Sequence, residues 1–279
     1  MSGRSHTRTA TTIKFGLAFL LLIPTLFPLL WIIVSSLKGS AETHTVPPTF
    51  IPREWSLEPY LVVLSRHKFL NYVFNSFVVA AGTTVWGVLV AAWGGYGFAR
   101  YTFRGKWLVM GFVLAAQSFP RILMVIPYFQ IASILNIKDT YFGLMLAYST
   151  FVQPFCIWMM KEYYAQIPIE LQEAALIDGC NHYSAFWLVV LPLVRPALAA
   201  TAMLSFLTGW NEYEFALVLT SSEKVRTVSV GISYFMGEFN ILWNAIMAAT
   251  AIATIPIVLV FLFLQKHIVH SLAAGAVKG

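Results

Sequence analysis

The chain has 279 residues, of which 58% are hydrophobic and only 11% are charged, and its formal net charge is +6. Soluble domains carry about a quarter charged residues, so this composition excludes an ordinary soluble domain and favours a surface that faces lipid. In a membrane protein a positive charge reflects Lys and Arg at cytoplasmic membrane edges, and it does not indicate nucleic-acid binding. The two cysteines, Cys156 and Cys180, lack the spacing of a zinc site or a disulfide framework.

The chain begins with a short polar tail, residues 1–14, followed by an uncharged apolar run from Phe15 to Leu37. This run is long enough to cross a bilayer and longer than the apolar region of a signal peptide. Because no small-residue cleavage site follows it, we expect a retained transmembrane helix.

Five further segments are long and apolar enough for a helix to cross a bilayer core of about 30 Å. The sequence therefore predicts an all-α integral membrane protein, with a transmembrane domain over residues 15–265. The third span is interrupted by Arg121, and Gly and Pro occur within most of the spans. These residues fit ordinary helix packing or a bundle that rearranges around a pathway. The six expected spans are 15–37, 72–99, 107–131, 140–160, 197–219 and 239–265.

Lys and Arg in the short loops indicate the orientation. The stretch "RYTFRGK" after the second span contains Arg100, Arg104 and Lys106. With six spans, the N-terminal tail, this stretch and the C-terminal tail 266–279 lie on one side, so we expect both termini in the cytoplasm. The long loop 161–195 between the fourth and fifth spans is then also cytoplasmic.

This loop reads as two helices. In "IPIELQEAALIDG", Pro168 suits a first helical position, and Gly179 suits the left-handed residue that ends a helix. Apolar residues then recur at helical spacing and predict a second helix with one apolar face. The loop is either an interfacial element that packs under the bundle or a docking element for a cytoplasmic partner. The expected apolar face consists of Tyr183, Phe186, Trp187, Val190 and Leu191.

The stretch "EAALIDGCNHYSAFWLVVLP" resembles the coupling-loop motif of permease subunits of bacterial and archaeal ATP-binding-cassette (ABC) importers. That motif reads E-A-A, three residues, G, nine residues, I, one residue, L-P, and Val189 replaces its Ile. Two further stretches, "GWNEYEFAL" and the terminal "SLAAGAVKG", resemble the carbohydrate-importer branch with a maltose-type permease of the shorter form. The residues that match the motif are Glu173, Ala174, Ala175, Gly179, Leu191 and Pro192.

The resemblance covers essentially the whole chain and implies the type I importer permease fold in the cytoplasmic membrane. It implies a second permease subunit in a heterodimer, two ATPase subunits that bind ATP and Mg, and an extracytoplasmic solute-binding protein. It also implies that the outer loop 220–238 reaches into the binding protein. The implied ATPase-coupling residues are Glu173, Ala174, Ala175, Asp178, Gly179 and Pro192, with Gly275, Val277, Lys278 and Gly279 of the tail at the ATPase interface.

Ionisable residues within expected spans usually face a cavity or one another, because lipid disfavours them. Arg121, Glu212 and Glu214 are such residues, and they could equally extend to the outer membrane interface. Trp210 would suit stacking on a sugar and Asn211 would suit its hydroxyls, although a Trp packed in a bundle is commoner. Arg121, Trp210, Asn211 and Glu212 are therefore candidates for the substrate pathway.

Three alternatives remain open. A stand-alone secondary transporter or channel would leave the coupling motif unexplained, and no internal repeat is visible. A membrane enzyme is disfavoured because the sequence contains no H-E-x-x-H, G-x-S-x-G or Walker A motif, so we expect no catalytic residue, metal site or cofactor in this chain. The third alternative keeps the family but changes the cargo from a carbohydrate to another polar solute, such as a glycerol phosphodiester.

Overall fold

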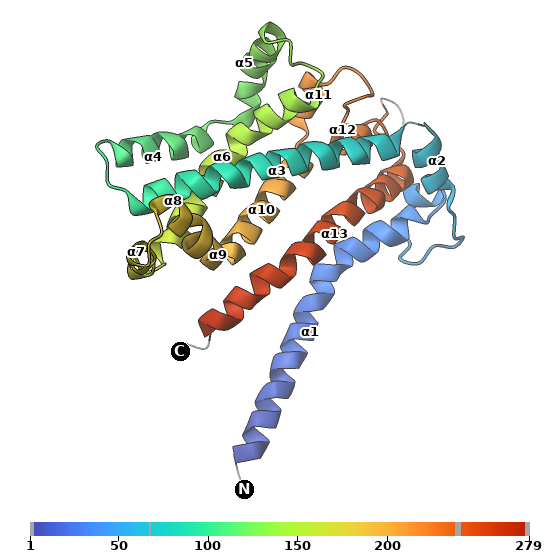
Figure 1. Ribbon diagram of the computed structural model, residues 1–279. Coiled ribbons are helices and arrows are strands. Elements are labelled where there is room, and N and C mark those ends of the chain that lie inside the picture. The colour runs from blue at the N-terminus through green and yellow to red at the C-terminus, as the bar shows by residue number, and fades with distance from the viewer. Residues whose placement is uncertain (1–2, 67, 238–240, 277–279) are drawn as a thin grey trace. The chain divides into compact units, whose positions relative to one another are not determined.

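A computed structural model describes residues 3–66, 68–237 and 241–276. Figure 1 shows a chain of helices. The described residues contain no β-strand, only two isolated β-bridges. The chain divides into two compact units. The first contains Met1–His67 and Ile232–Thr254, and the second contains Lys68–Gly231 and Ile255–Gly279.

The first unit contains α1 (Gly3–Ser36), η1 (Glu42–His44), α2 (Glu58–Arg66) and the beginning of α13 (Trp243–Ala276). Side chains around the end of α1 hold it together. The hydroxyls of Ser36 and Tyr60 lie 2.7 Å apart. The buried Lys38 donates from its ammonium group to the carbonyl of Thr49, and this group lies 4.7 Å from the centre of the Trp31 ring.

The second unit is built around three helices that pack along one another: α3 (Phe69–Arg100), α6 (Tyr141–Ala165) and α10 (Arg195–Trp210). Small residues allow α3 and α6 to approach closely. A Cβ atom at Gly95 would lie 2.6 Å from the Cβ of Met160 and 2.8 Å from the backbone nitrogen of Lys161, so a larger residue would push the helices apart. The shorter helices are α4 (Lys106–Ala115), η2 (Ala116–Ser118), α5 (Arg121–Ile134), α7 (Glu170–Ile177), α8 (His182–Ala185), η3 (Phe186–Val190), α9 (Leu191–Leu193), α11 (Glu214–Leu219) and α12 (Val228–Ser233).

Four helical segments are long and apolar enough to cross a membrane: Phe19–Ser36, Phe69–Arg100, Tyr141–Ala165 and Trp243–Lys266. They fall on the first, second, fourth and sixth expected spans. Two bent helix pairs meet the same criterion together, so up to six spans fit the described residues. The exposed side chains that the structure describes within Phe19–Ser36 and Trp243–Lys266 are mostly apolar, as expected of a surface that faces lipid. Examples are Leu20, Ile255 and Phe263, which are each more than half exposed.

The third expected span, 107–131, is not one straight helix. Its first part, Lys106–Ser118, and its second part, Arg121–Ile134, meet at an angle of 101°. The break falls at Phe119 and Pro120, which both have extended backbone. Proline has no N–H to continue the helical hydrogen bonds, and it disfavours helical backbone in the residue before it. Arg121 is therefore the first residue of α5 rather than an interruption within a span.

The fifth expected span, 197–219, is also divided. The helix α10 ends at Trp210, and the separate short helix α11 begins at Glu214. At the other end, the segment His182–Leu193 meets α10 at an angle of 76°. Glu212 and Glu214 thus lie at or beside a helix start and not in a continuous helix.

Candidate functional site

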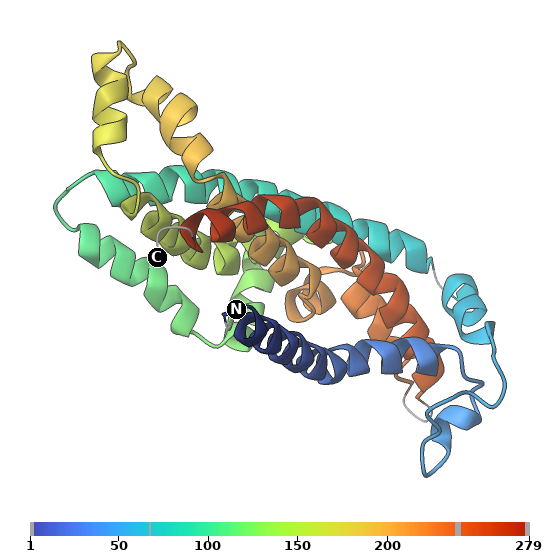
Figure 2. The same ribbon diagram turned by 90° about the horizontal axis from the view of Figure 1, so that it is seen from below.

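The loop 161–195 projects from the helices of the second unit, and Figure 2 shows it in yellow beyond the end of α3. Its first helix, α7, begins at Glu170, two residues after Pro168, with Ile169 as the capping residue. The expected position of Pro168 in the first turn was therefore two residues too early. Glu170 and Glu173 lie in the first turn, where the positive end of the helix dipole favours carboxylates.

The prediction that Gly179 ends this helix is confirmed. Gly179 has a φ of +93°, in the left-handed region that glycine adopts without a Cβ penalty. The N–H of Cys180 donates to the carbonyl of Ala175 over 3.0 Å, and the N–H of Gly179 donates to that of Leu176 over 3.2 Å. This pair of bonds is the Schellman motif, and it turns the chain sharply into the second helix.

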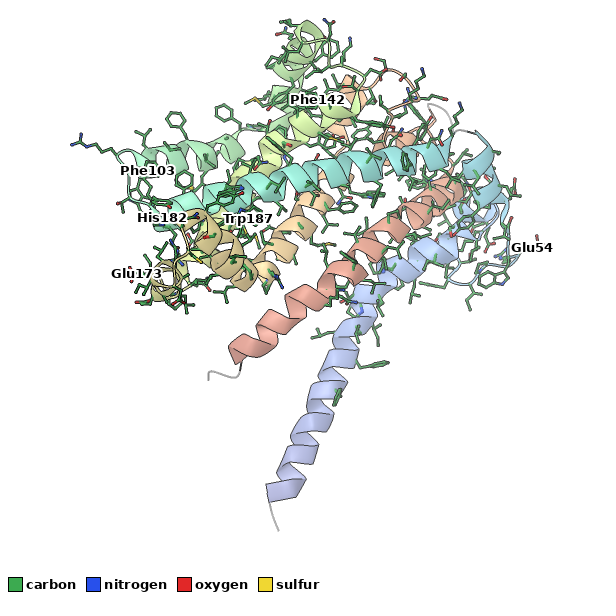
Figure 3. The ribbon with its side chains drawn as sticks, viewed as in Figure 1. Glu54, Phe103, Phe142, Glu173, His182 and Trp187 are labelled. Carbon is green, nitrogen blue, oxygen red and sulfur yellow. The ribbon has the colours of Figure 1, made fainter. Side chains whose placement is uncertain are left out.

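The helix α7 is buried on one side only. Gln172 and Ala175 are 7% and 6% exposed, whereas Ile177 is 86% exposed. Glu173 and Ala174 are exposed as well, and Figure 3 labels Glu173 on the outer side of the loop. The two alanines of the motif therefore have different environments, because Ala174 faces outward and Ala175 packs inward. The outward face, which we call the α7 face, consists of Leu171, Glu173, Ala174, Ile177 and Asp178.

The second helix of the loop is present, and its expected apolar face packs toward the membrane helices. It runs as α8, the π-helical turn η3 and α9, and it begins where the Asn181 side chain accepts the N–H of Ser184 over 2.8 Å. Phe186 and Val190 are buried, whereas Tyr183 is 63% exposed. Tyr183 nevertheless stacks on Trp93 of α3, with 5.6 Å between the ring centroids, so it lies on the same face as Phe186.

Phe186 attaches this loop to the transmembrane helices. Its ring centroid lies 4.5 Å from that of Trp93 and 4.7 Å from that of Tyr96, both on α3, and 6.3 Å from that of Tyr164 on α6. Aromatic pairs at these separations contribute about 0.5–1.5 kcal/mol each beyond their buried area. Trp187 adds an edge contact to Trp93 at 5.8 Å, and Figure 3 shows Trp187 toward α3.

A polar contact ties the start of the loop to the same helix. The Nη2 of Arg100, the last residue of α3, donates to the carbonyl of Ile167 over 2.9 Å. The basic stretch with Arg104 and Lys106 follows directly, so it lies at the same end of α3 as the loop 161–195. The basic stretch and the loop 161–195, which were both expected on the cytoplasmic side, therefore lie at one end of the second unit.

A cavity of about 620 Å³ lies at α5, α10 and the segment between α10 and α11. It contains Arg121, Asn211 and Glu212, three of the four expected pathway residues, together with Thr208 and Glu214. Such a mixture of charges, amide and hydroxyl groups suits a polar solute. The remaining lining residues are Ile122, Leu204, Leu207 and Tyr213.

Glu212 also has a local structural role. Its carboxylate accepts the N–H groups of Phe215 over 2.8 Å and Ala216 over 3.0 Å, and it thereby caps the start of α11. Trp210 is only 2% exposed and is not among the residues that line this cavity. Its ring stacks on that of Phe206, with 5.6 Å between the ring centroids, so it contributes to the packing of α10.

The remaining expected residues belong to the loop 161–195 and to the C-terminal tail. Pro192 is partly buried in α9, and Gly275 lies near the end of α13. Val277, Lys278 and Gly279 lie outside the described residues. The contact of Trp93 with Phe186 was not predicted, because spacing along the chain gives no signal for it.

A largely apolar set of long helices, a projecting helical loop and a polar cavity together define a polytopic membrane transport protein. Residues 84–273 match the family described as the binding-protein-dependent transport system inner membrane component, and the chain belongs to this family. It is a permease subunit of an ABC importer and not an enzyme, as the coupling-loop motif predicted. Such a subunit works with an ATPase and a solute-binding protein.

Curated relatives match nearly the full chain. The trehalose/maltose transport system permease protein of Thermococcus litoralis is 38% identical over 94% of this chain and 95% of that protein. The sulfoquinovosyl glycerol transport system permease protein of Agrobacterium fabrum is 32% identical over 99% and 97%. The trehalose transport system permease protein of Mycobacterium tuberculosis is 36% identical over 91% and 93%.

Solved structures show the same fold. A chain of a bacterial ABC transporter that imports the acidic polysaccharide alginate aligns with a TM-score of 0.76 at 23% identity, over 95% of this chain and 98% of that chain. A chain of an inward-facing methionine ABC transporter aligns with a TM-score of 0.58 at 18% identity, over 76% and 97%. The predicted type I importer permease fold is thus confirmed.

Proposed function

We propose that this chain forms half of a translocation pathway for a sugar or oligosaccharide and pairs with a second, different permease subunit. Two ATPase subunits would drive the pair, and an extracytoplasmic solute-binding protein would deliver the cargo. The curated relatives described above support a carbohydrate cargo, because they are permeases for trehalose, maltose and a sugar glycoside. The polar cavity with Arg121, Asn211 and Glu212 supports a hydroxyl-rich solute.

The observation that carries the proposal is the exposed α7 face. Ile177 is 86% exposed, and it follows the exposed Glu173 and Ala174 by about one helical turn and directly precedes the exposed Asp178. An apolar residue on a short helix with an acidic rim fits a groove that offers an apolar floor and basic or polar walls. In this proposal α7 inserts into such a groove on the ATPase, and closure of the ATPase pair moves the loop. The tail residues Gly275, Val277, Lys278 and Gly279 approach the same interface.

This arrangement places both termini and the loop 161–195 in the cytoplasm. The basic stretch at Arg100, Arg104 and Lys106 supports it, because positive residues favour the cytoplasmic edge. Arg100 also contacts the loop through the carbonyl of Ile167, so the basic stretch and the loop lie at the same end of α3, which supports a common cytoplasmic side.

Co-purification of the assembled complex from membranes tests the docking. Glu173→Lys should reduce recovery of the ATPase several-fold, while the variant permease still inserts and still co-purifies with the second permease. Undiminished ATPase recovery together with unchanged uptake would refute a role for the α7 face.

Two further experiments test the cargo and the orientation. Thermal-shift assays of the cognate binding protein with trehalose, maltose and a glycerol phosphodiester should show stabilisation by a carbohydrate. Stabilisation by the phosphodiester alone would assign the other cargo class. A single Cys introduced in loop 161–195 should resist a membrane-impermeant thiol reagent applied to intact cells, and its labelling from outside would overturn the orientation.

A further inference from the structure

The backbone of the segment between α11 and α12, residues 220–227, receives two hydrogen bonds from one buried amide. Asn75 on α3 is 2% exposed, and its Nδ2 donates to the carbonyl of Lys224 over 3.0 Å and to that of Arg226 over 2.8 Å. Its Oδ1 accepts the hydroxyl of Tyr141 over 2.7 Å, which fixes the orientation of the amide. Asn75 therefore uses both ends of its side chain, and its two donors are bound to the backbone of this segment.

Neighbouring side chains fix the two flanks. The carboxylate of Asp139 accepts the N–H groups of Ser221 over 2.8 Å and of Ser222 over 3.0 Å. On the other flank, the Ser76 hydroxyl accepts the N–H of Val228 over 2.7 Å. Within the segment, the Nη2 of Arg226 donates to the carbonyl of Ser221 over 3.3 Å. The backbone is therefore held at several points, mostly by side chains of the neighbouring helices and loop.

The segment has a buried base and an exposed tip. Val225, Thr227 and Val228 are 8% exposed or less. The side chains of Glu223 and Lys224 are exposed at the tip, immediately before this buried stretch. A carbonyl of the exposed tip, that of Lys224, is thus one of the two that Asn75 holds.

The tip lies at the opposite end of α3 from the α7 loop. Asn75 is in the second turn of this helix and Arg100 is its last residue, so they are separated by most of a helix that is about 48 Å long at 1.5 Å per residue. If the α7 face meets the ATPase at one membrane side, the solute-binding protein has to approach the other side. The tip at Glu223 and Lys224 lies toward that opposite side.

We propose that Asn75 is a positioning residue for the solute-binding protein: it holds the tip at Glu223 and Lys224 in the orientation that the binding protein contacts. The residue acts through the Lys224 and Arg226 carbonyls and does not itself touch the partner. A preformed tip reduces the ordering cost of association, so loss of Asn75 weakens docking of the binding protein and leaves the ATPase interface intact. This inference rests on the proposed assembly but not on the identity of the cargo.

The test uses the complete complex of both permeases and the ATPase in nanodiscs, titrated with its binding protein. Asn75→Asp keeps the size of the side chain but removes both N–H donors and places a carboxylate against two carbonyls. The control is Asn71→Asp, the same change one helical turn earlier at an exposed position of α3. Tyr141→Phe removes the hydroxyl that orients the amide and that also lies 3.4 Å from the carbonyl of Lys224.

Asn75→Asp should raise the binding-protein concentration that gives half-maximal ATPase stimulation by about tenfold or more, because two hydrogen bonds are lost. Tyr141→Phe should give a smaller rise and Asn71→Asp none, while basal ATP hydrolysis stays unchanged in all three. A merely structural defect would instead lower basal hydrolysis and maximal stimulation together. An unchanged half-stimulating concentration for Asn75→Asp, or a loss of basal hydrolysis in step with stimulation, would overturn the proposal.

A second measurement does not depend on the partner. Spin labels at Lys224→Cys and at the exposed Leu135→Cys, with Cys180→Ser, report the position of the tip by electron paramagnetic resonance distance measurement. The distance distribution should be narrow in the parent and broad with Asn75→Asp, and equal widths would refute the positioning role. If the wild-type complex shows no stimulation by a binding protein, the proposed function fails, while this distance still tests Asn75.

Discussion

The ring of Phe186 lies against the indole of Trp93, with 4.5 Å between the ring centroids and 30° between the planes. Phe186 belongs to the projecting loop and Trp93 to α3, the long helix of the second unit. Because Phe186 is only 1% exposed, this contact is part of the core and not a surface association. A displacement of the loop therefore has to move α3 or break the contact, and this gives the α7 face a mechanical link to the membrane helices.

Replacing Phe186 by Ala should separate ATP hydrolysis from transport. The substitution removes the ring contacts to α3 and α6 and should cost about 3–5 kcal/mol of stability, as for other buried Phe→Ala changes. The exposed α7 face remains, so the ATPase should still associate and hydrolyse ATP. Measuring hydrolysis and uptake in the same proteoliposomes should show a higher ratio of ATP hydrolysed to solute imported. Leu188→Ala, at a residue that is 69% exposed, is the control and should change neither quantity.

Ile177→Ser should weaken ATPase association without destabilising the permease. Ile177 is 86% exposed, so the free subunit loses almost no packing. In the complex, loss of a fully buried Ile side chain should cost about 1.5–3 kcal/mol, or roughly a 10- to 150-fold loss of affinity. Affinity measured between the detergent-solubilised permease pair and the ATPase checks this, with the thermal unfolding midpoint as the control. Equal affinity for the variant and the parent would show that the α7 face lies outside the interface.

Substitutions at Gly179 should reduce ATPase recovery according to how poorly the new residue adopts left-handed backbone. No atom lies within 4 Å of a Cβ added at this position, so only the backbone conformation is at issue. Ala at a φ of +93° should cost about 1–2 kcal/mol, whereas Asn adopts left-handed backbone more readily. ATPase recovery should therefore fall in the order Gly, Asn, Ala. Equal recovery for Ala and Asn would indicate that the turn adjusts without affecting α7.

The ends of α7 in the loop 161–195 could be predicted from local chemistry. Gly179 ends α7 through its own backbone conformation, and the acids of α7 favour the first turn of their own helix. Both effects depend only on neighbouring residues, so they predict where the helix begins and ends. The six apolar runs were visible for the same reason, because lipid requires apolar residues all along a helix. Pro120 was also visible, although the extent of the bend that it causes depends on the packing of α4 and α5.

Long-range pairing could not be derived in this way. Phe186 and Trp93 are far apart in sequence, and nothing in their spacing indicates that they touch. The π turn at Phe186–Val190 has no sequence signature either. Helical spacing placed Tyr183 on the apolar face that contacts Trp93, but it gave no indication that Tyr183 stays mostly exposed there. The environment of Trp210 was equally hidden, because the polar residues that follow it give no sign that its ring packs on Phe206.

Asp139 should give the outer segment a pH dependence in the acid range. Partial burial alone would raise the pKa of Asp139, but hydrogen bonds donated by Ser222 and Ser221 outweigh it, and the pKa lies below its usual value. The ionised carboxylate therefore stabilises the fold above the unfolded pKa of about 3.9, and this contribution is lost as pH falls through the lowered pKa. The stability difference between the parent and Asp139→Asn, followed by thermal unfolding from pH 6 to pH 3, should narrow at the acid end. A difference that is constant over this range would show that ionised Asp139 does not stabilise the segment.

Asn211 and Trp210 are adjacent, but their substitutions should have different effects. Asn211 lines the polar cavity, so Asn211→Ala should reduce solute uptake several-fold while the unfolding midpoint changes little. Trp210 is buried against Phe206, so Trp210→Ala should cost about 3–5 kcal/mol of stability and lower the yield of folded permease. Uptake normalised to folded permease should then fall for Asn211→Ala more than for Trp210→Ala. Arg121→Ala should resemble Asn211→Ala, because Arg121 is exposed at the same cavity. Normalised uptake that falls only for Trp210→Ala would place the pathway away from this cavity and restore Trp210 as a solute contact in another conformation.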